Sequence, residues 1–292
     1  MAEYRTCRTI SATVRLPQMN SVSLSDHPFR IPPGKQVSVE EIPTRDESLF
    51  SIDKKEGKKL FAKLEAEIDE LQTRLYAEGK HRLLVVFQAM DTGGKDGTIR
   101  SVFNPMDPQG IRVASFKRPS SKELAHDYLW RVHKQVPGNG ETVIFNRSHY
   151  EDIIAVRIRE IFPESKWRKR FEHIVNFEQM LADEGTTLVK IFLNISHDEQ
   201  KERLQARLDE PDKNWKFNPG DLDDRALWPQ FMTAYNEVFE KTSTEVAPWY
   251  VVPADRKWYR NIVVADIIAK TLRELNMQYP PVDFDPDSIT IK

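Results

Sequence analysis

The stretch Leu83–Ile99 carries the residues best suited to chemistry. A short apolar run ends at a glycine-rich turn, and a helical pattern follows the turn. Backbone amides of such a turn bind phosphate at the helix N-terminus, and a neighbouring lysine adds positive charge. The sequence therefore predicts a phosphate-binding loop, whose binding residues are Gly93, Gly94, Lys95, Asp96, Gly97 and Thr98.

This loop departs from the Walker A pattern at two positions. Ala89 replaces the first glycine, and Asp96 replaces the usual hydroxyl residue. The alternative interpretation is a tight strand-to-helix turn with Asp96 as the helix N-cap. Asp91 favours phosphate binding, because a carboxylate inside such a loop would repel phosphate unless a cation lay between them. Asp91 thus predicts a divalent metal at the loop.

Cations follow the next predicted strand. Lys117 and Arg118 stand before Pro119, and the helix after them carries Arg131. Two cations on a proline-stiffened turn suit a phosphate or a nucleotide monophosphate. The alternative is a solvated surface turn. We interpret Lys117, Arg118 and Arg131 as nucleotide-binding candidates.

The third predicted strand ends at Asn146-Arg147. Asn146 stands where a magnesium-supporting carboxylate is usual, and Asp152 follows slightly later as a candidate metal ligand. Arg147 would lie near the loop and could hold transferring phosphoryl oxygens. The alternative is a helix cap, with Ser148 capping and Asp152 favouring the helix dipole.

The polar stretch Asp209–Asp224 is the predicted lid. Its length favours a mobile segment that closes over phosphates and excludes water. The alternative is an ordinary helix-to-helix loop. Its cations Lys213 and Lys216, and Arg207 on the predicted helix before it, would bind a phosphate chain.

Strands and helices alternate along the chain. Strands are predicted at 83–87, 111–116, 142–145, 187–195 and 249–252. Helices are predicted at 55–79, 98–103, 121–136, 150–161, 166–183, 198–208, 223–244 and 257–275. This order predicts a three-layer α/β/α P-loop kinase fold, with a parallel sheet of about five strands and a helical lid. Ligands then bind at the carboxyl ends of the strands.

Length and composition set the domain organisation. We expect an N-terminal extension over residues 1–47, partly disordered, a phosphotransferase domain over 48–278 with its lid at about 209–224, and a tail over 279–292. The net charge of −2 predicts no general affinity for nucleic acid or membranes. The single cysteine, Cys7, and the lack of a signal-peptide pattern favour the cytoplasm.

Four ordered motifs resemble the polyphosphate kinase 2 family. They are Ala89–Gly97, Phe116–Pro119, His126–Arg131 and Ile144–Asp152, and the resemblance covers roughly Phe29 to Leu275. It implies a thymidylate-kinase-like enzyme that moves a phosphoryl group between inorganic polyphosphate and a nucleotide. The implied cofactor is Mg²⁺, with Mn²⁺ as a substitute, and the implied nucleotides carry adenine or guanine. A homodimer or homotetramer is also expected.

The resemblance assigns roles to residues. It implies that Asp91 binds magnesium, that Lys95 binds the phosphate chain, and that Arg147 binds phosphoryl oxygens. Lys117 and Arg118 would lie at the nucleotide. Asn146 resembles the branches that act on AMP, alone or together with ADP, and the sequence leaves this choice open.

Two other functions fit the same sequence. One is an ATP-dependent nucleoside monophosphate kinase on the same fold. The other is a nucleotide sensor without turnover. In the favoured hypothesis the nucleotide's terminal phosphate attacks the end phosphoryl of polyphosphate in line, and no strong general base is needed.

Overall fold

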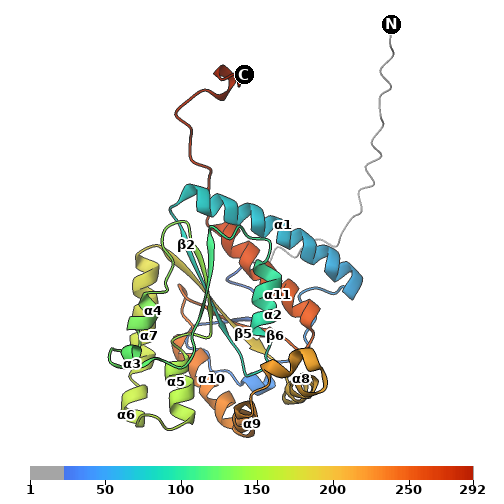
Figure 1. Cartoon of the computed structure of the whole chain (residues 1–292), viewed down its shortest axis with the longest axis vertical. Coiled ribbons are helices and arrows are strands. Elements are labelled where there is room, and N and C mark those ends of the chain that lie inside the picture. Colours follow the sequence, from blue (N-terminus) through green and yellow to red (C-terminus); the bar gives the residue numbers. More distant parts are fainter. Residues whose placement is uncertain (1–22, 292) are drawn as a thin grey trace.

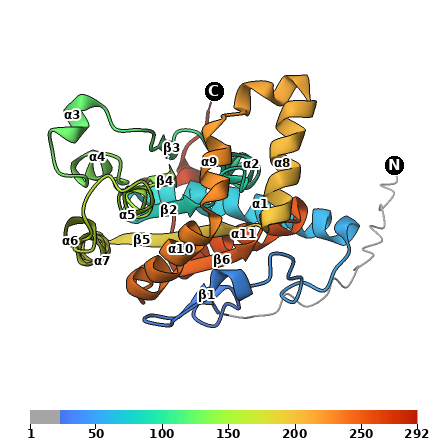
Figure 2. The same cartoon turned by 90° about the horizontal axis from the view of Figure 1, so that it is seen from below.

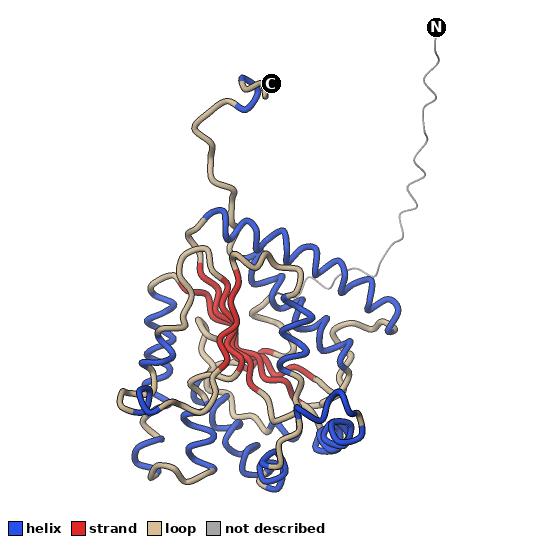
Figure 3. The backbone as a smooth tube through the Cα atoms, viewed as in Figure 1, coloured by secondary structure: helices blue, strands red, loops and turns tan. Residues whose placement is uncertain are grey.

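The computed structural model describes residues 23–291 and is built on a six-stranded sheet (Figures 1 and 3). The strand order is β1-β6-β5-β2-β4-β3. The strands are β1 (Arg30–Ile31), β2 (Arg82–Gln88), β3 (Ile111–Ser115), β4 (Thr142–Asn146), β5 (Thr186–Asn194) and β6 (Trp249–Pro253). Neighbouring strands are parallel, except that β1 is antiparallel to β6. The predicted fold class is confirmed.

Helices cover both faces of the sheet (Figure 2). The α-helices are α1 (Lys54–Glu78), α2 (Lys95–Phe103), α3 (Ser121–Leu124), α4 (Trp130–His133), α5 (Glu151–Ile158), α6 (Glu164–Trp167), α7 (Arg170–Asp183), α8 (His197–Asp209), α9 (Gly220–Ala226), α10 (Trp228–Thr242) and α11 (Lys257–Glu274). The described residues also form the short 3-10 helices η1 (Val39–Glu41), η2 (Pro211–Lys216) and η3 (Pro286–Ser288). One face packs on α1, α2 and α11, and the other on α5, α7 and α10.

Strand β2 lies in the centre and is buried on both faces. Leu83, Val85 and Phe87 join the core beneath α1, α2 and α11, whereas Leu84 and Val86 join the opposite core. Successive side chains of a strand point to opposite faces, so a continuous apolar run serves two helix layers at once. This fixes the loop after β2 at the carboxyl edge of the sheet.

Helix α1 has strong end signals. Asp53 and Glu56 form a capping box at its start, and Gly79 ends it in the left-handed conformation (φ 64°). Its buried Leu64, Ile68 and Leu75 belong to the same core as α11. The apolar stripe, expected to pack on the sheet or on a partner chain, is therefore covered within the chain.

Three predicted helices are divided in the structure. The helix expected over 121–136 is α3 and α4, because the Asp127 carboxylate accepts hydrogen bonds from the amides of Leu129 and Trp130 and caps a new turn. The helix expected over 166–183 is α6 and α7. The helix expected over 223–244 is α9 and α10, since Pro229 can stand only in the first turn of a helix.

The sheet has one strand more than the sequence predicts. The expectation of about five strands holds for the parallel ones, and β1 adds a sixth, with Arg30 opposite Tyr250 and Ile31 opposite Trp249. A strand of two residues before a Pro-Pro pair carries no period-two pattern, so the sequence gives no sign of it. The predicted disorder of the N-terminus falls mainly on residues 1–22, outside the described residues. Among the described residues, no helix is long and apolar enough to cross a membrane.

A buried charged network joins β5 to α7 and α10. The Lys190 ammonium donates to Glu178 Oε2 (2.6 Å), to Tyr150 Oη (2.9 Å) and to the Thr242 carbonyl (2.6 Å). Tyr150 donates to Glu178 Oε1 (2.8 Å), and His149 Nε2 lies 3.2 Å from the same oxygen. The four side chains Lys190, Glu178, Tyr150 and His149 are fully buried. The network therefore fastens the segment that follows β4.

We expect Glu178→Ala to destabilise the fold by about 3–5 kcal/mol, because it leaves the Lys190 ammonium buried without a counter-charge. Chemical denaturation would measure the free energy of unfolding. The double variant Lys190→Met, Glu178→Gln removes both charges, so it should lose less stability than the single variant. A double variant that loses more would contradict this account.

Candidate active site

The phosphate-binding loop lies between β2 and α2, at the carboxyl edge of the sheet. Gly94 is the N-cap of α2 and has a positive φ of 98°. A Cβ added at Gly94 would lie 2.2 Å from Arg260 Nη1, so both the backbone angle and the space require glycine. The amides of the first turn of a helix have no partner within the helix, so the start of α2 can serve as an anion site.

The Lys95 side chain turns back over the loop. Its ammonium donates to the carbonyls of Ala89 (2.9 Å) and Met90 (3.4 Å), and the residue is 9% exposed. Burial, together with the nearby Arg147, lowers the pKa of Lys95 to about 8. The Lys95 ammonium has only two neutral carbonyls as hydrogen-bond partners, so a bound anion would stabilise its charge. Lys95 is therefore placed to bind phosphate.

Asp91 pairs with Arg147. Arg147 Nη2 donates to Asp91 Oδ1 at 2.6 Å, and Arg147 has a positive φ of 61° directly after β4. Glu151, one turn later, lies 3.7 Å from Arg147 Nη1 and, with Asp91, raises the Arg147 pKa. The sequence predicts both residues at the site, and the structure brings them together. That Asp91 binds a metal stays a prediction.

Helix α9 brings carboxylates to Asp91 that the sequence reading did not assign. Burial and the neighbouring Asp91 raise the pKa of Asp221. Burial and Asp91 also raise the pKa of Asp224, although Arg159 at 2.8 Å opposes the rise. Both aspartates lie at the end of the predicted lid, of which the sequence analysis named only the cations as ligand-binding candidates. Crowded carboxylates of this kind favour a bound cation.

Asn146 and Asp96 face each other at the mouth of the loop. Asn146 Nδ2 donates to Asp96 Oδ1 at 2.6 Å. Asp96 is in the first turn of α2, where its charge favours the helix dipole, but Gly94 and not Asp96 is the N-cap. The N-cap alternative for Asp96 is therefore wrong.

A second group of cations lies on the other side of the loop. Arg260 of α11 is 3% exposed, and burial together with Arg203 lowers its pKa to about 10. Arg203 Nη1 donates to the Thr92 carbonyl at 3.1 Å. Burial and Arg203 also lower the pKa of Lys257. The sequence reading missed Arg260 and Lys257, although their three-residue spacing after a strand end is a usable signal.

The lid residues are ordered here as η2 and the start of α9. Arg207 Nη1 donates to Asp221 Oδ2 and to the Lys216 carbonyl, both at 2.9 Å. Lys213 pairs with Glu210, and Lys216 lies 5.0 Å from the ring centroid of Trp215. Arg207 of α8 therefore holds the two ends of the lid segment together. The Trp215 side chain is 78% exposed.

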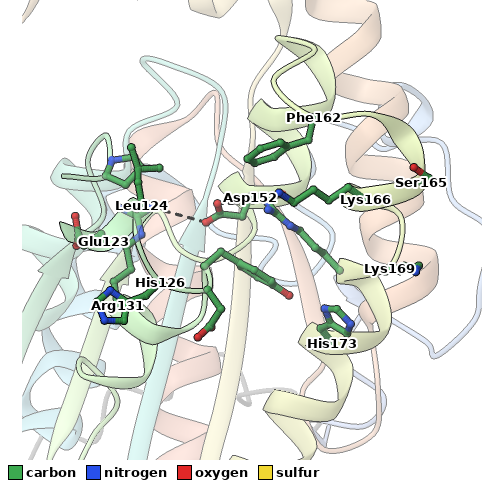
Figure 4. Close-up of a pocket in the computed structure, with 14 residues that line it drawn as sticks. Glu123, Leu124, His126, Arg131, Asp152, Phe162, Ser165, Lys166, Lys169 and His173 are labelled. Atoms are coloured by element: carbon green, nitrogen blue, oxygen red, sulfur yellow. Dashed lines mark hydrogen bonds and ion pairs between the residues drawn. The ribbon is translucent and has the colours of Figure 1, made fainter. Parts of the chain in front are cut away.

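Asp152 lies away from the loop, in a cavity of about 570 Å³ (Figure 4). It stands between Arg131 Nη2 (3.8 Å) and Arg170 Nη1 (3.5 Å). Arg170 also lies 4.5 Å from the ring centroid of Tyr128. This cavity separates α3 and α4 from α6 and α7, and its lining mixes aromatic rings with charges, as a nucleotide pocket does.

Lys117 and Arg118 are exposed at the end of β3 and line a neighbouring hollow of about 360 Å³. Arg131 joins the two spaces, since its Nη1 donates to the Lys117 carbonyl at 2.8 Å. Three of the four predicted nucleotide residues, Lys117, Arg118 and Arg131, therefore line these two spaces, whereas Asn146 lies at the loop and pairs with Asp96. Within residues 23–291, no cluster of three or more His, Cys, Asp or Glu side chains could hold a metal.

Comparison with known proteins finds one family along most of the chain. The family Polyphosphate kinase 2 (PPK2) matches residues 51–280. An AMP/ADP-polyphosphate phosphotransferase of Meiothermus ruber is 52% identical over 264 residues, which are 90% of this chain and 99% of that protein. An ADP-polyphosphate phosphotransferase of Rhodopseudomonas palustris is 42% identical, over 86% of this chain and 91% of that protein.

A solved structure of a member of the same family is also similar to this chain. The crystal structure of Polyphosphate Kinase 2 from Arthrobacter aurescens TC1 superposes with a TM-score of 0.85 and 44% sequence identity. The match covers 88% of this chain and 93% of that one.

We expect tripolyphosphate to bind the free protein less tightly as the pH rises through about 8, the pKa of Lys95, because only the protonated ammonium attracts the anion. Affinity should fall by about tenfold for each pH unit above that value. Calorimetric titration at several pH values would measure it. The matched control is Lys95→Arg, which stays charged and should lose this dependence; an equally steep fall in the control would contradict the assignment.

Proposed function

Because this chain belongs to the polyphosphate kinase 2 family, we propose that it transfers phosphoryl groups from inorganic polyphosphate to AMP and to ADP, giving ADP and ATP. The observation that carries the proposal is the relative named for both acceptors, which matches 90% of this chain. The chain is thus an enzyme, a polyphosphate:nucleotide phosphotransferase. The reaction is reversible in principle, and guanine nucleotides are further candidate acceptors.

The transfer exchanges one P–O bond for another. A terminal phosphate oxygen of the nucleotide attacks the end phosphorus of polyphosphate, and the bridging oxygen leaves with its electron pair on the shortened chain. The attacking oxygen is already anionic at neutral pH, so the step needs no general base. Lys95 and the amides of α2 hold the polyphosphate end, and Arg147 neutralises charge on the transferring oxygens.

Magnesium is the proposed cofactor, with manganese as a substitute. Asp91 and the nearby Asp221 and Asp224 would supply hard oxygen ligands. Burial and the neighbouring Asp91 raise the pKa values of Asp221 and Asp224, and a bound cation would offset this repulsion. Fewer than three of these carboxylates converge among the described residues, so phosphate oxygens and water would complete the coordination. A bound Mg²⁺ would neutralise phosphate charge. Asp152, the other candidate, stands between two arginines, so we favour the α9 carboxylates.

The cavity shown in Figure 4 is the proposed nucleotide pocket. Its volume of about 570 Å³ is within the usual range for a small-molecule site. Tyr128, under the Arg170 guanidinium, offers a ring edge for a base, and Arg131 offers a cation on the side toward Lys117. The proposal extends to a cytoplasmic homodimer or homotetramer, which light scattering would test.

We expect the protein to form ADP and ATP from AMP, Mg²⁺ and long-chain polyphosphate, with no ATP supplied. Lys95→Ala should lower the rate by on the order of 10²-fold or more, because it removes a charge that acts on the transition state. Chromatography of the nucleotides measures both. If AMP is phosphorylated with ATP as the donor but not with polyphosphate, the protein is a nucleoside monophosphate kinase. If AMP binds but is not phosphorylated by either donor, the protein is a nucleotide sensor.

We expect Asp91→Asn to raise the magnesium concentration needed for half-maximal activity, since it removes a proposed metal ligand. The matched control is Asp69→Asn, on the exposed face of α1, which makes the same change of charge far from the loop. Magnesium titrations of the rate compare the two variants. An unchanged magnesium requirement in Asp91→Asn would refute its role as a ligand.

A further inference from the structure

The first turns of α1 present cations that the fold does not use. Lys54, Lys55, Lys58, Lys59 and Lys63 are all exposed. Among the described residues, the ion pairs of α1 involve its acidic side chains and Arg74, and none involves these five lysines.

This arrangement works against helix stability. A helix N-terminus carries partial positive charge, so nearby cations are unfavourable there. Lys54 and Lys58 are four residues apart, as are Lys55 and Lys59, and like charges at this spacing repel. The capping box of Asp53 and Glu56 offsets only part of this charge. An anion bound across the lysines would relieve both effects.

The lysines lie beside the cations of the phosphate-binding loop. A Cβ added at Gly57 of α1 would lie 2.6 Å from the Trp258 ring, so this turn of α1 rests on the start of α11 (Figure 1). Trp258 stands between Lys257 and Arg260 in the sequence, and Arg260 touches Gly94 of the loop. Lys54 is one helical turn from Gly57, or about 5 Å along the axis. Positive charge therefore continues from the loop, over the start of α11, to α1.

Two of the lysines lie on the side of α1 that leads toward the segment after α2. Lys54 and Lys58 fall, at helical spacing, on the line that continues through Gln72 and Tyr76. Gln72 Oε1 accepts a hydrogen bond from the amide of Asp107, in the segment after α2, at 3.1 Å. This line of α1 thus reaches the segment that follows α2.

Helix α2 carries an exposed cation one turn beyond the loop. Arg100 is exposed on α2 and stands one turn beyond Gly97. A Cβ added at Gly97 would lie 3.9 Å from Arg260 Nη2, which puts the Gly97 side of α2 next to α11. Arg100 therefore extends the positive charge of the loop by one turn of α2.

Lys59 and Lys63 point elsewhere. They continue, at the same spacing, to Glu67, which pairs with Arg273 at 2.6 Å near the far end of α11. The helix thus offers two pairs of lysines with equal charge on different sides.

We propose that Lys54 and Lys58 form an exosite that binds the distal part of a long polyphosphate chain while its end lies at Lys95. The inference rests on the proposed function, since it supposes polyphosphate as the donor. Each phosphate of the chain carries negative charge, and a long chain extends beyond the few residues of the loop. The exosite would raise affinity for long chains through effective concentration and would leave short chains unaffected.

The test compares Lys54→Gln, Lys58→Gln with the matched control Lys59→Gln, Lys63→Gln. Both remove two exposed charges from one helix. The KM for long-chain polyphosphate should rise roughly three- to tenfold in the first variant, given the modest worth of exposed charge contacts. Its KM for a chain of a few phosphates, its kcat, and both constants of the control should stay within twofold. The rise should also shrink as salt increases.

Three results would overturn the exosite: no change in KM, an equal change in the control, or an equal change with the short chain. A lower mass by light scattering in the first variant alone would show instead that the lysines contact a second copy of this chain. If the parent protein turns over neither chain, the proposed function fails. Calorimetric titration with long-chain polyphosphate then decides the exosite separately, because only the first variant should bind more weakly than the parent.

Discussion

The structure depends on placing like charges together at one edge of a sheet that is buried on both faces. Arg203 and Arg260 crowd one side of the loop. Lys95 and Arg147 lie with Asp91, near the α9 carboxylates. Removing charges from water is costly, and the shifted pKa values of Lys95 and Asp224 record that cost. The central strand β2 and its two cores hold these groups in place. A phosphate chain with a divalent cation is the ligand that would satisfy both sets at once.

The sequence predicts well what depends on neighbouring residues. The run ending at Phe87, the glycines at 93 and 94, and Lys95 define strand, turn and helix within one stretch, and the structure keeps them. The alternation of strands and helices along the chain also predicts where each strand ends. This prediction brings Asn146 and Arg147 to the loop, as the structure shows. Parallel strands bring their carboxyl ends to one edge whatever the connecting helices do.

What the sequence could not predict depends on packing between distant segments. Asp224 reaches the site only because Pro229 ends one helix and starts another, which turns α9 toward Asp91. Arg260 lies at the loop because α11 returns across α2, and nothing near it in the sequence indicates that path. Asp152 follows Arg147 closely but points to the opposite side of α5, where two arginines hold it. The direction of a side chain, and not its position in the sequence, decided each case.

Strand β1 has a consequence for how the sheet ends. It covers the outer edge of β6, whose backbone groups would otherwise face solvent, and Phe29 and Ile31 fill the cores on either side of it. Open edges invite pairing with other chains. The segment before α1 is thus part of the domain's protection against aggregation, although it carries none of the catalytic groups. The opposite edge, at β3, has no such cover among the described residues, and there the charges of Lys117 and Arg118 at the strand's end help to discourage strand pairing.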